Sequence, residues 1–314
     1  MPSELASSPC IAIGAIVKNE GPYILEWVAY HRSLGVDHFF IADNASDDGT
    51  SQLLAGLHAI GVIDHFAFPG PPGRPPQLPA YTQIMGRYRE EADWIAFIDA
   101  DEFILPTDGA RSIRPFFSAL ESNVGAVVLN WAIYGSSFRQ EPADGLVIER
   151  FTRRAREDHL TNLHYKTVVR TGVFRGVGSN PHLLRIQDGL CTIQADGFEV
   201  AEHPEIGPGL SDRLVWSPLR INHYVVKSRA EFDRKKVPRG RATMTNVFRD
   251  DGFFRGHDMN EILEPTEEWL VEATKTDILF LKDRLRSAGV PEETVSLDRV
   301  VATLRPIAIA REGE

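Results

Sequence analysis

The feature that most constrains the fold of this chain is a run of apolar residues that three acids interrupt. Residues 94–98 read W-I-A-F-I, after which come Asp99, Asp101 and Glu102 before apolar residues resume at 103–105. Five apolar residues in a row predict a strand that is buried on both faces. The acids then lie where the strand leaves its sheet, which is the edge at which open α/β sheets bind ligands. They either form a solvated turn or hold a hard divalent cation, and the apolar flanks favour the cation.

Two earlier apolar runs each end in a polar loop, and a helical pattern follows each loop. The runs at residues 10–17 and 36–42 predict buried strands, helices are expected at 23–34 and up to Gly61, and 62–68 predicts a third strand. This alternation predicts an α/β protein with a mostly parallel central sheet and helices on both of its faces. Both polar loops then emerge at the carboxyl ends of strands, where a nucleotide would bind.

The rest of the chain gives a less regular pattern of elements. The expected helices and strands are helices at 81–92, 114–122 and 267–289, and strands at 125–132, 146–150, 166–170 and 220–226. Residues 172–196 are expected to be rich in loops, and residues 227–241 are strongly basic.

Charge and composition argue against several classes of protein. A net charge of −10 over 314 residues disfavours broad binding to nucleic acid or anionic lipid. The chain has no three-glycine dinucleotide fingerprint and no P-loop, which disfavours nicotinamide enzymes and ordinary ATPases. No run of about 18 apolar residues predicts a transmembrane segment, and the first residues lack the pattern of a signal peptide. With two cysteines that do not suggest a disulfide, we expect a cytoplasmic protein, peripheral to a membrane only through its acceptor.

Six short segments within residues 11–242 form a specific set in their order and spacing. They read IVKNE, YILEWVAYH, IADNASDDGT, WIAFIDADEF, NHYVVKSRAEF and KKVPRGRA. Together they resemble the family-2-type glycosyltransferases of the GT-A fold, and more narrowly the bacterial branch related to the DUF23 or family-92 glycosyltransferases. The resemblance implies a GT-A domain at 1–242, with a nucleotide-sugar half at about 1–105 and an acceptor half at about 106–242. A mainly helical C-terminal extension is expected at 243–314.

The resemblance also implies a reaction. Such enzymes transfer a sugar from a nucleoside diphosphate to a hydroxyl acceptor, here a glycan, a lipid-linked glycan or a protein. A Mn²⁺ or Mg²⁺ cofactor would offset the charge that develops on the leaving diphosphate. Asp101 corresponds to the metal ligand, Asp99 to the ribose or metal partner, and His223 to a further metal ligand. By the same resemblance, the transfer inverts the anomeric centre.

Residues in the loops correspond to the nucleotide pocket of the family. Asn19 and Glu20 correspond to the surroundings of the ribose, Asp43 and then Asn44 to the base contact, and Lys227 to a partner of the diphosphate. A carboxylate can accept the ring N–H of uracil, which favours a UDP-sugar. The alternative at 43–48 is a turn that caps the following helix, and the alternative for Lys227 and the lysines after it is a solvated basic face.

The sequence leaves the general base open. Glu102 and His182 are the two main candidates, and Glu141, Glu149 and Asp158 are also conceivable. Two other functions compete with sugar transfer. A metal-dependent sugar-phosphate nucleotidyltransferase would also use an acidic metal site, but its first loop is usually glycine-rich and basic. A nucleotide- or glycan-binding module without turnover is the third alternative.

Overall fold

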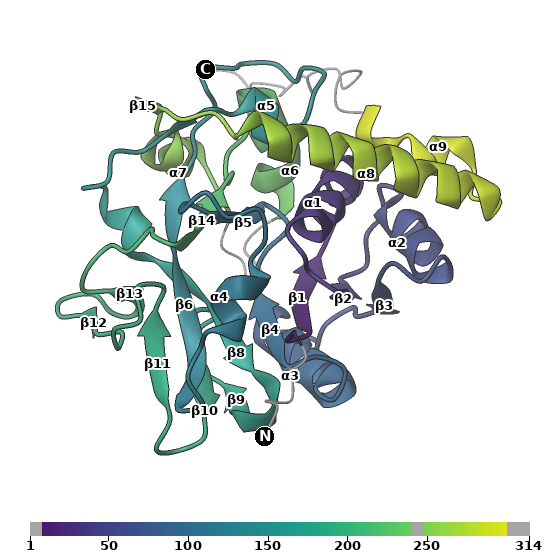
Figure 1. Cartoon of the computed structure of the whole chain (residues 1–314). Coiled ribbons are helices and arrows are strands. Elements are labelled where there is room, and N and C mark those ends of the chain that lie inside the picture. The colour runs from purple at the N-terminus through teal and green to yellow at the C-terminus, as the bar shows by residue number, and fades with distance from the viewer. Residues whose placement is uncertain (1–7, 240–247, 300–314) are drawn as a thin grey trace.

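The computed structural model describes residues 8–239 and 248–299 and is built around a nine-stranded sheet (Figure 1). The strands follow the order β3-β2-β1-β4-β8-β6-β14-β5, and β11 pairs with β6. They are β1 (Ile11–Val17), β2 (His38–Asp43), β3 (Asp64–Ala67), β4 (Trp94–Phe97), β5 (Glu102–Pro106), β6 (Val124–Ile133), β8 (Tyr165–Arg170), β11 (Cys191–Gln194) and β14 (Leu219–His223).

Most strand pairs in this sheet are parallel. The order β3-β2-β1-β4 is parallel throughout. Strand β8 runs antiparallel to β4 and β6, whereas β14 runs parallel to β6 and antiparallel to the edge strand β5. The predicted α/β class, with the GT-A fold and its mostly parallel sheet, is therefore confirmed.

Helices cover both faces of the sheet, and each face forms its own hydrophobic core. The side chains of β1 alternate between these two cores. Ile13 and Val17 belong to a core that includes α1 (Gly21–Ser33), α2 (Thr50–Ala59) and α8 (Glu268–Ser287). Ile16 belongs to a second core with Tyr81 and Ile84 of α3 (Gln77–Tyr88). Burial of one such aliphatic side chain stabilises a fold by about 1.5–3 kcal/mol, so this alternation fixes the register of the strand.

The carboxyl-terminal elements pack against the sheet. Helix α8 lies along α1 (Figure 1), where Arg32 Nε donates to Asp277 Oδ2 over 2.7 Å. Strand β15 (Ile262–Leu263) pairs with β7 (Arg153–Arg154). The remaining elements of this part are α7 (Asp251–His257), α9 (Glu292–Val295) and the 3₁₀ turn Leu297–Arg299. The predicted extension at 243–314 begins and ends outside the described residues.

One predicted strand is a helix. Residues 146–150 form α5 (Val147–Arg150), so the strand prediction was wrong. The Glu26 carboxylate of α1 accepts the backbone N–H groups of Val147 and Ile148, at 2.8 and 3.1 Å, and Glu149 Oε2 accepts the N–H of Leu146. These acceptors satisfy donors that a strand would have to pair with a neighbour.

Other differences concern the bounds of elements. Helix α3 begins at Gln77 instead of 81, because Pro79 is tolerated in a first turn, where its missing N–H has no helical partner. The region expected to be rich in loops contains β9 (Phe174–Val177), β10 (Leu184–Ile186) and β11. The other elements are α4 (Arg114–Ser118), α6 (Arg229–Arg239), β12 (Glu202–His203), β13 (Gly207–Ser211) and two 3₁₀ turns, Leu160–Leu163 and Thr171–Val173. Within the described ranges, no helix is long and apolar enough to cross a bilayer.

Candidate active site

A cavity of about 280 Å³ lies at the edge of the sheet where β1 and β4 end. Five of the residues predicted for the site line it: Glu20, Asp99, Asp101, His182 and His223. Five others do not: Asn19, Asp43, Asn44, Glu102 and Lys227. The structure thus brings five of the ten predicted residues together at one cavity and places the other five outside its wall.

Asp101 and His223 meet although they are far apart in sequence. Strand β14 pairs with β5 so that His223 lies opposite Glu102, and this register brings His223 Nε2 to 3.6 Å from Asp101 Oδ1. Lys236, from α6, forms an ion pair with Asp101 Oδ2. Burial raises the pKa of Asp101, but the charges and hydrogen bonds of Lys236 and His223 outweigh burial and hold this pKa well below its usual range. Asp101 is therefore an ionised carboxylate in the wall of the cavity.

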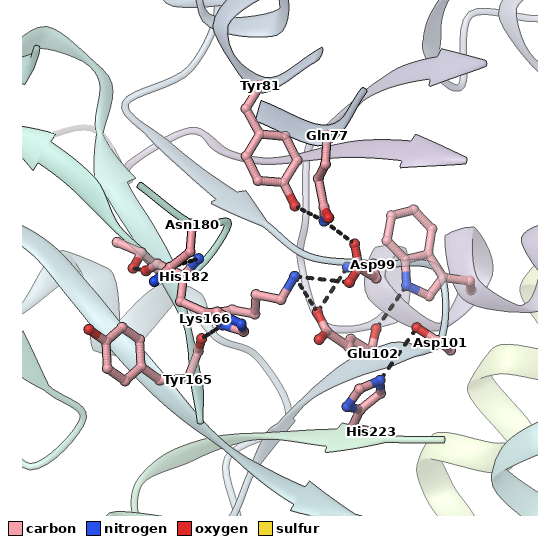
Figure 2. Close-up of polar contacts among 12 residues, drawn as sticks. Gln77, Tyr81, Asp99, Asp101, Glu102, Tyr165, Lys166, Asn180, His182 and His223 are labelled. Carbon is pink, nitrogen blue, oxygen red and sulfur yellow. Dashed lines mark hydrogen bonds and ion pairs between the residues drawn. The ribbon is translucent and has the colours of Figure 1, made fainter. Parts of the chain in front are cut away.

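Asp99 does not join Asp101 and His223, although all three were predicted to bind one metal ion. Its two carboxylate oxygens accept from Gln77 Nε2 at 2.8 Å and from Lys166 Nζ at 3.0 Å (Figure 2). Among the residues that the structure describes, no group of three or more His, Cys, Asp or Glu side chains is arranged to hold a metal. Among these residues, Asp101 and His223 are the pair that could hold a cation. Mg²⁺ is commonly held by one or two carboxylates and completes its shell with water and phosphate, so the carboxylate of Asp101 fits such an ion, and the His223 imidazole beside it is a nitrogen donor.

Glu102 lies behind the cavity and not in its wall. It is fully buried, and its Oε2 accepts the backbone N–H of Asp99 at 2.9 Å and lies 3.5 Å from Lys166 Nζ. Burial raises its pKa well above the usual range, which the charge of Lys166 offsets only in part. A buried carboxyl group that does not reach the cavity is poorly suited to act as a general base. Its contacts indicate that it supports the turn between β4 and β5.

His182 lies in the wall of the cavity, as predicted for a catalytic residue. Its Nδ1 is 2.6 Å from the carbonyl oxygen of Tyr165, and because a carbonyl can only accept, Nδ1 carries the proton. Burial, together with the nearby charge of Lys166, lowers the pKa of His182 to about 3. The imidazole is therefore neutral. The rings of His164 and Trp131 lie next to it, with their centroids 5.5 and 5.3 Å from that of His182.

The predicted nucleotide contacts Asp43, Asn19 and Asn44 hydrogen-bond within and between the polar loops and do not line the cavity. Asp43 accepts from the hydroxyls of Ser46 and Ser51, and Asn44 Nδ2 donates to the carbonyl of Phe68 at 3.0 Å. Asn19 Nδ2 donates to Asp47 Oδ1 at 2.8 Å. These contacts form a structured turn before α2, but the N-cap residue of α2 is Gly49, which supplies no side-chain cap, so the alternative of a helix-capping turn is met only in part.

The lysine that reaches the site is not the predicted one. Lys227 Nζ donates to the carbonyl of Tyr224 at 3.3 Å and lies 4.5 Å from the centre of the Tyr23 ring, outside the cavity wall. For the basic residues after Lys227, a solvated face and a place in the site were considered equally good interpretations. In the structure, two of them on α6 pair with acids of the cavity wall. Lys235 pairs with Glu20, and Lys236 pairs with Asp101. Arg241, at the end of the basic stretch, lies outside the described residues.

Several polar residues of the cavity wall were missed, and Lys166 and Gln77 are two of them. Lys166, on β8, and Gln77, at the start of α3, both line the cavity and both contact Asp99. A lysine inside a short strand looks like a residue on a solvated face, so periodicity gave no signal for Lys166. The only signal for Lys236 was its place in the KKVPRGRA segment.

Comparison with known proteins identifies the family. The family model described as Glycosyltransferase family 92 matches residues 9–174, more than half of the chain. The chain belongs to glycosyltransferase family 92. The match contains the acids at 99–102 and Lys166, whereas His223 and Lys236 lie beyond it. The predicted resemblance is thus confirmed.

Two family 92 relatives that are similar to this chain are plant proteins, and both are longer than it. A family 92 protein of Arabidopsis thaliana is 28% identical over 172 residues, which are 51% of this chain and 28% of the relative. One of Ricinus communis is 27% identical over 199 residues, which are 62% of this chain and 35% of the relative. The chain thus spans about a third of the length of these relatives.

Similar solved structures are distant. TarS of S. aureus has 16% sequence identity and a TM-score of 0.35, over 52% of this chain and 47% of that one. Glucosyl-3-phosphoglycerate synthase of Mycobacterium tuberculosis, solved with Mn²⁺, UDP-glucose and phosphoglyceric acid, has 15% identity and a TM-score of 0.33, over 60% of this chain and 70% of that one.

Proposed function

We propose that this protein is a glycosyltransferase that moves a sugar from a nucleoside diphosphate sugar, preferably a UDP-sugar, to a hydroxyl group of a glycan, a lipid-linked glycan or a protein. The observation that carries the proposal is the convergence of Asp101, His223 and Lys236 on one cavity in a family 92 chain. The cavity lies at the carboxyl ends of parallel strands, where α/β proteins bind nucleotides.

In the proposed reaction, the acceptor hydroxyl attacks the anomeric carbon and the bond from that carbon to the diphosphate oxygen breaks. The diphosphate leaves with the bonding electrons, so negative charge grows on its oxygens. Lys236 is the cation of α6 that lies nearest Asp101, and its ammonium would donate to these oxygens. The hydroxyl proton passes to a base. Of the two candidate bases only His182 lines the cavity, where its neutral imidazole would accept the proton, although its low pKa makes it a weak base.

Asp101 and His223 would hold the Mn²⁺ or Mg²⁺ ion, with phosphate oxygens completing its coordination. When bound, the ion would supply positive charge next to the leaving diphosphate. Lys236 now occupies one oxygen of Asp101. Because two cations at one carboxylate repel each other, the ammonium would move from Asp101 to the phosphates when the donor and its metal bind.

The proposal is tested by release of nucleoside diphosphate from a panel of UDP-, GDP- and TDP-sugars. We expect UDP release in the presence of Mn²⁺ or Mg²⁺, loss of release with EDTA, and recovery when excess metal is added. Activity that EDTA leaves unchanged would contradict the metal role. Pyrophosphate release from UTP and a sugar phosphate would instead support a nucleotidyltransferase. Calorimetric binding of UDP-sugars without turnover would support a binding module.

Removing the ammonium at position 236 tests the contact with the diphosphate. Lys236→Met should lower kcat/KM for the UDP-sugar by about 10-fold to 100-fold, since a hydrogen bond to a charged group contributes about 1.5–3 kcal/mol. Initial rates of UDP release measure the effect. Lys275→Met is the matched control, because Lys275 lies half-exposed on α8, where it pairs with Glu149. If both variants keep the wild-type kcat/KM, Lys236 does not contact the donor.

A further inference from the structure

We infer that Lys166 is a positioning residue of the proposed transferase, and that it acts by holding the carboxylate of Asp99 toward the cavity for a hydroxyl of the donor. The inference rests on the proposed function and adds to it a residue from the middle of β8. The inference gives the two acids different roles. Asp99 would accept a hydrogen bond from a donor hydroxyl, and Asp101 would contact the cation.

The first observation is the burial of a charged lysine. Lys166 is only 1% exposed, so its ammonium has lost almost all contact with solvent. An ammonium in such a place must be compensated by acidic groups. Two are present, since Asp99 Oδ2 lies 3.0 Å and Glu102 Oε2 lies 3.5 Å from Lys166 Nζ (Figure 2).

The second observation is the complete set of contacts around Asp99. Lys166 holds Oδ2, Gln77 Nε2 donates to Oδ1 at 2.8 Å, and the backbone N–H of Asp99 donates to Glu102 Oε2 at 2.9 Å. Gln77 is itself fixed, because its Nε2 also donates to the hydroxyl of the buried Tyr81. The carboxylate is therefore held from α3 on one side and from β8 on the other.

The third observation is that Asp99 still faces the cavity. Its side chain is 35% exposed, whereas those of Lys166 and Glu102 are 1% and 0% exposed. A carboxylate oxygen can accept more than one hydrogen bond, so each oxygen of Asp99 keeps capacity for a ligand hydroxyl. Lys166 also lines the cavity, but it is only 1% exposed and its ammonium is directed at Asp99. It would therefore act through Asp99, whose position it fixes in advance of binding.

Lys166 has two acids within reach, the completely buried Glu102 and the partly exposed Asp99, and its shorter contact is to Asp99. Gln77 approaches the same carboxylate from the opposite side and lines the cavity as well. Lys166 and Gln77 therefore both donate to Asp99, which, unlike Glu102, lies in the wall of the cavity.

The test is a double-mutant cycle on the full chain with a UDP-sugar and Mn²⁺. Lys166→Gln should lower kcat/KM by about 10-fold to 100-fold, mainly through a higher KM, as is typical when a supporting contact is lost. Asp99→Asn should lower kcat/KM as well. In the Asp99→Asn background, Lys166→Gln should change kcat/KM by less than about twofold, because residues that act through each other are not additive.

The controls separate positioning from folding. Lys282→Gln removes another buried lysine, which pairs with Asp298 on a distant helix at 2.6 Å, and it should reduce thermal stability while kcat/KM stays at the wild-type value. If Lys166→Gln does not fold, Lys166→Arg replaces it in the cycle, since arginine keeps the charge but changes the geometry at Asp99.

Three outcomes decide the question. Non-additive losses in kcat/KM support the inference. Losses that multiply in the double variant, or a Lys166 variant with wild-type KM, overturn it and leave Lys166 as a structural residue. A wild-type protein that neither binds nor turns over any UDP-, GDP- or TDP-sugar would instead refute the proposed function, which is a separate result.

Discussion

Replacing Asp101 with asparagine should lower release of UDP from the donor by about 100-fold to 1,000-fold, the range seen when one preorganised electrostatic contact of a transition state is lost. Asp101 is the buried, ionised carboxylate that lies nearest His223 in the cavity. Asparagine has nearly the same shape but no charge, so it would hold neither a divalent cation nor the Lys236 ammonium. Steady-state assays with saturating metal and donor measure the effect on kcat.

This substitution also disturbs folding, and the two effects must be separated. Asp101→Asn leaves Lys236 buried without its counter-charge, which should lower the free energy of unfolding. The double variant Asp101→Asn with Lys236→Gln removes both charges, so it should regain stability in urea denaturation and stay inactive. Asp283→Asn, on the exposed surface of α8, is the matched control and should keep wild-type activity. A stable Asp101→Asn protein with normal turnover would show that this cavity is not the site of transfer.

The sequence predicted the sheet well because its strands carry strong local signals. Residues 94–98 and 10–17 are apolar without interruption, and both are buried central strands. Where hydrogen bonds from residues distant in sequence determine the secondary structure, the local pattern gave the wrong prediction. Residues 146–150 look like a strand, but Glu26 of α1 supplies acceptors to the first N–H groups of a helix there.

The candidate site was only partly predictable for a similar reason. Asp101 and His223 could be paired from the resemblance, and the β5–β14 register places them together. Glu102 was misleading because it follows Asp101 in sequence, whereas its side chain points under the turn toward Lys166. No periodicity distinguishes a lysine that enters a buried site from one on a solvated face, since the difference lies in the partner that tertiary packing supplies. Lys166 and Lys236 therefore emerged only from the structure.

The second large effect is expected on stability, at the ion pair between Arg150 of α5 and Glu231 of α6. Their side chains are 4% and 1% exposed, and Arg150 Nη1 lies 3.0 Å from both oxygens of Glu231. Tyr23 and Ser228 also donate to this carboxylate through their hydroxyls. Glu231→Gln would leave the guanidinium buried without a counter-charge, so we expect a loss of about 3–5 kcal/mol in the free energy of unfolding. Urea denaturation measures this loss.

An exposed ion pair provides the control for this prediction. Arg156 and Asp158 are 68% and 74% exposed, and Asp158→Asn should cost less than about 1 kcal/mol because solvent screens the pair. Helix α6 also carries Lys235 and Lys236 to Glu20 and Asp101. If loss of the ion pair loosens α6, the Glu231→Gln protein should show a higher KM for the donor when it is assayed at a low temperature at which it remains folded. Equal stability of the Glu231→Gln and Asp158→Asn proteins would mean that α6 is anchored by its apolar contacts, such as that of the buried Phe232, and not by this ion pair.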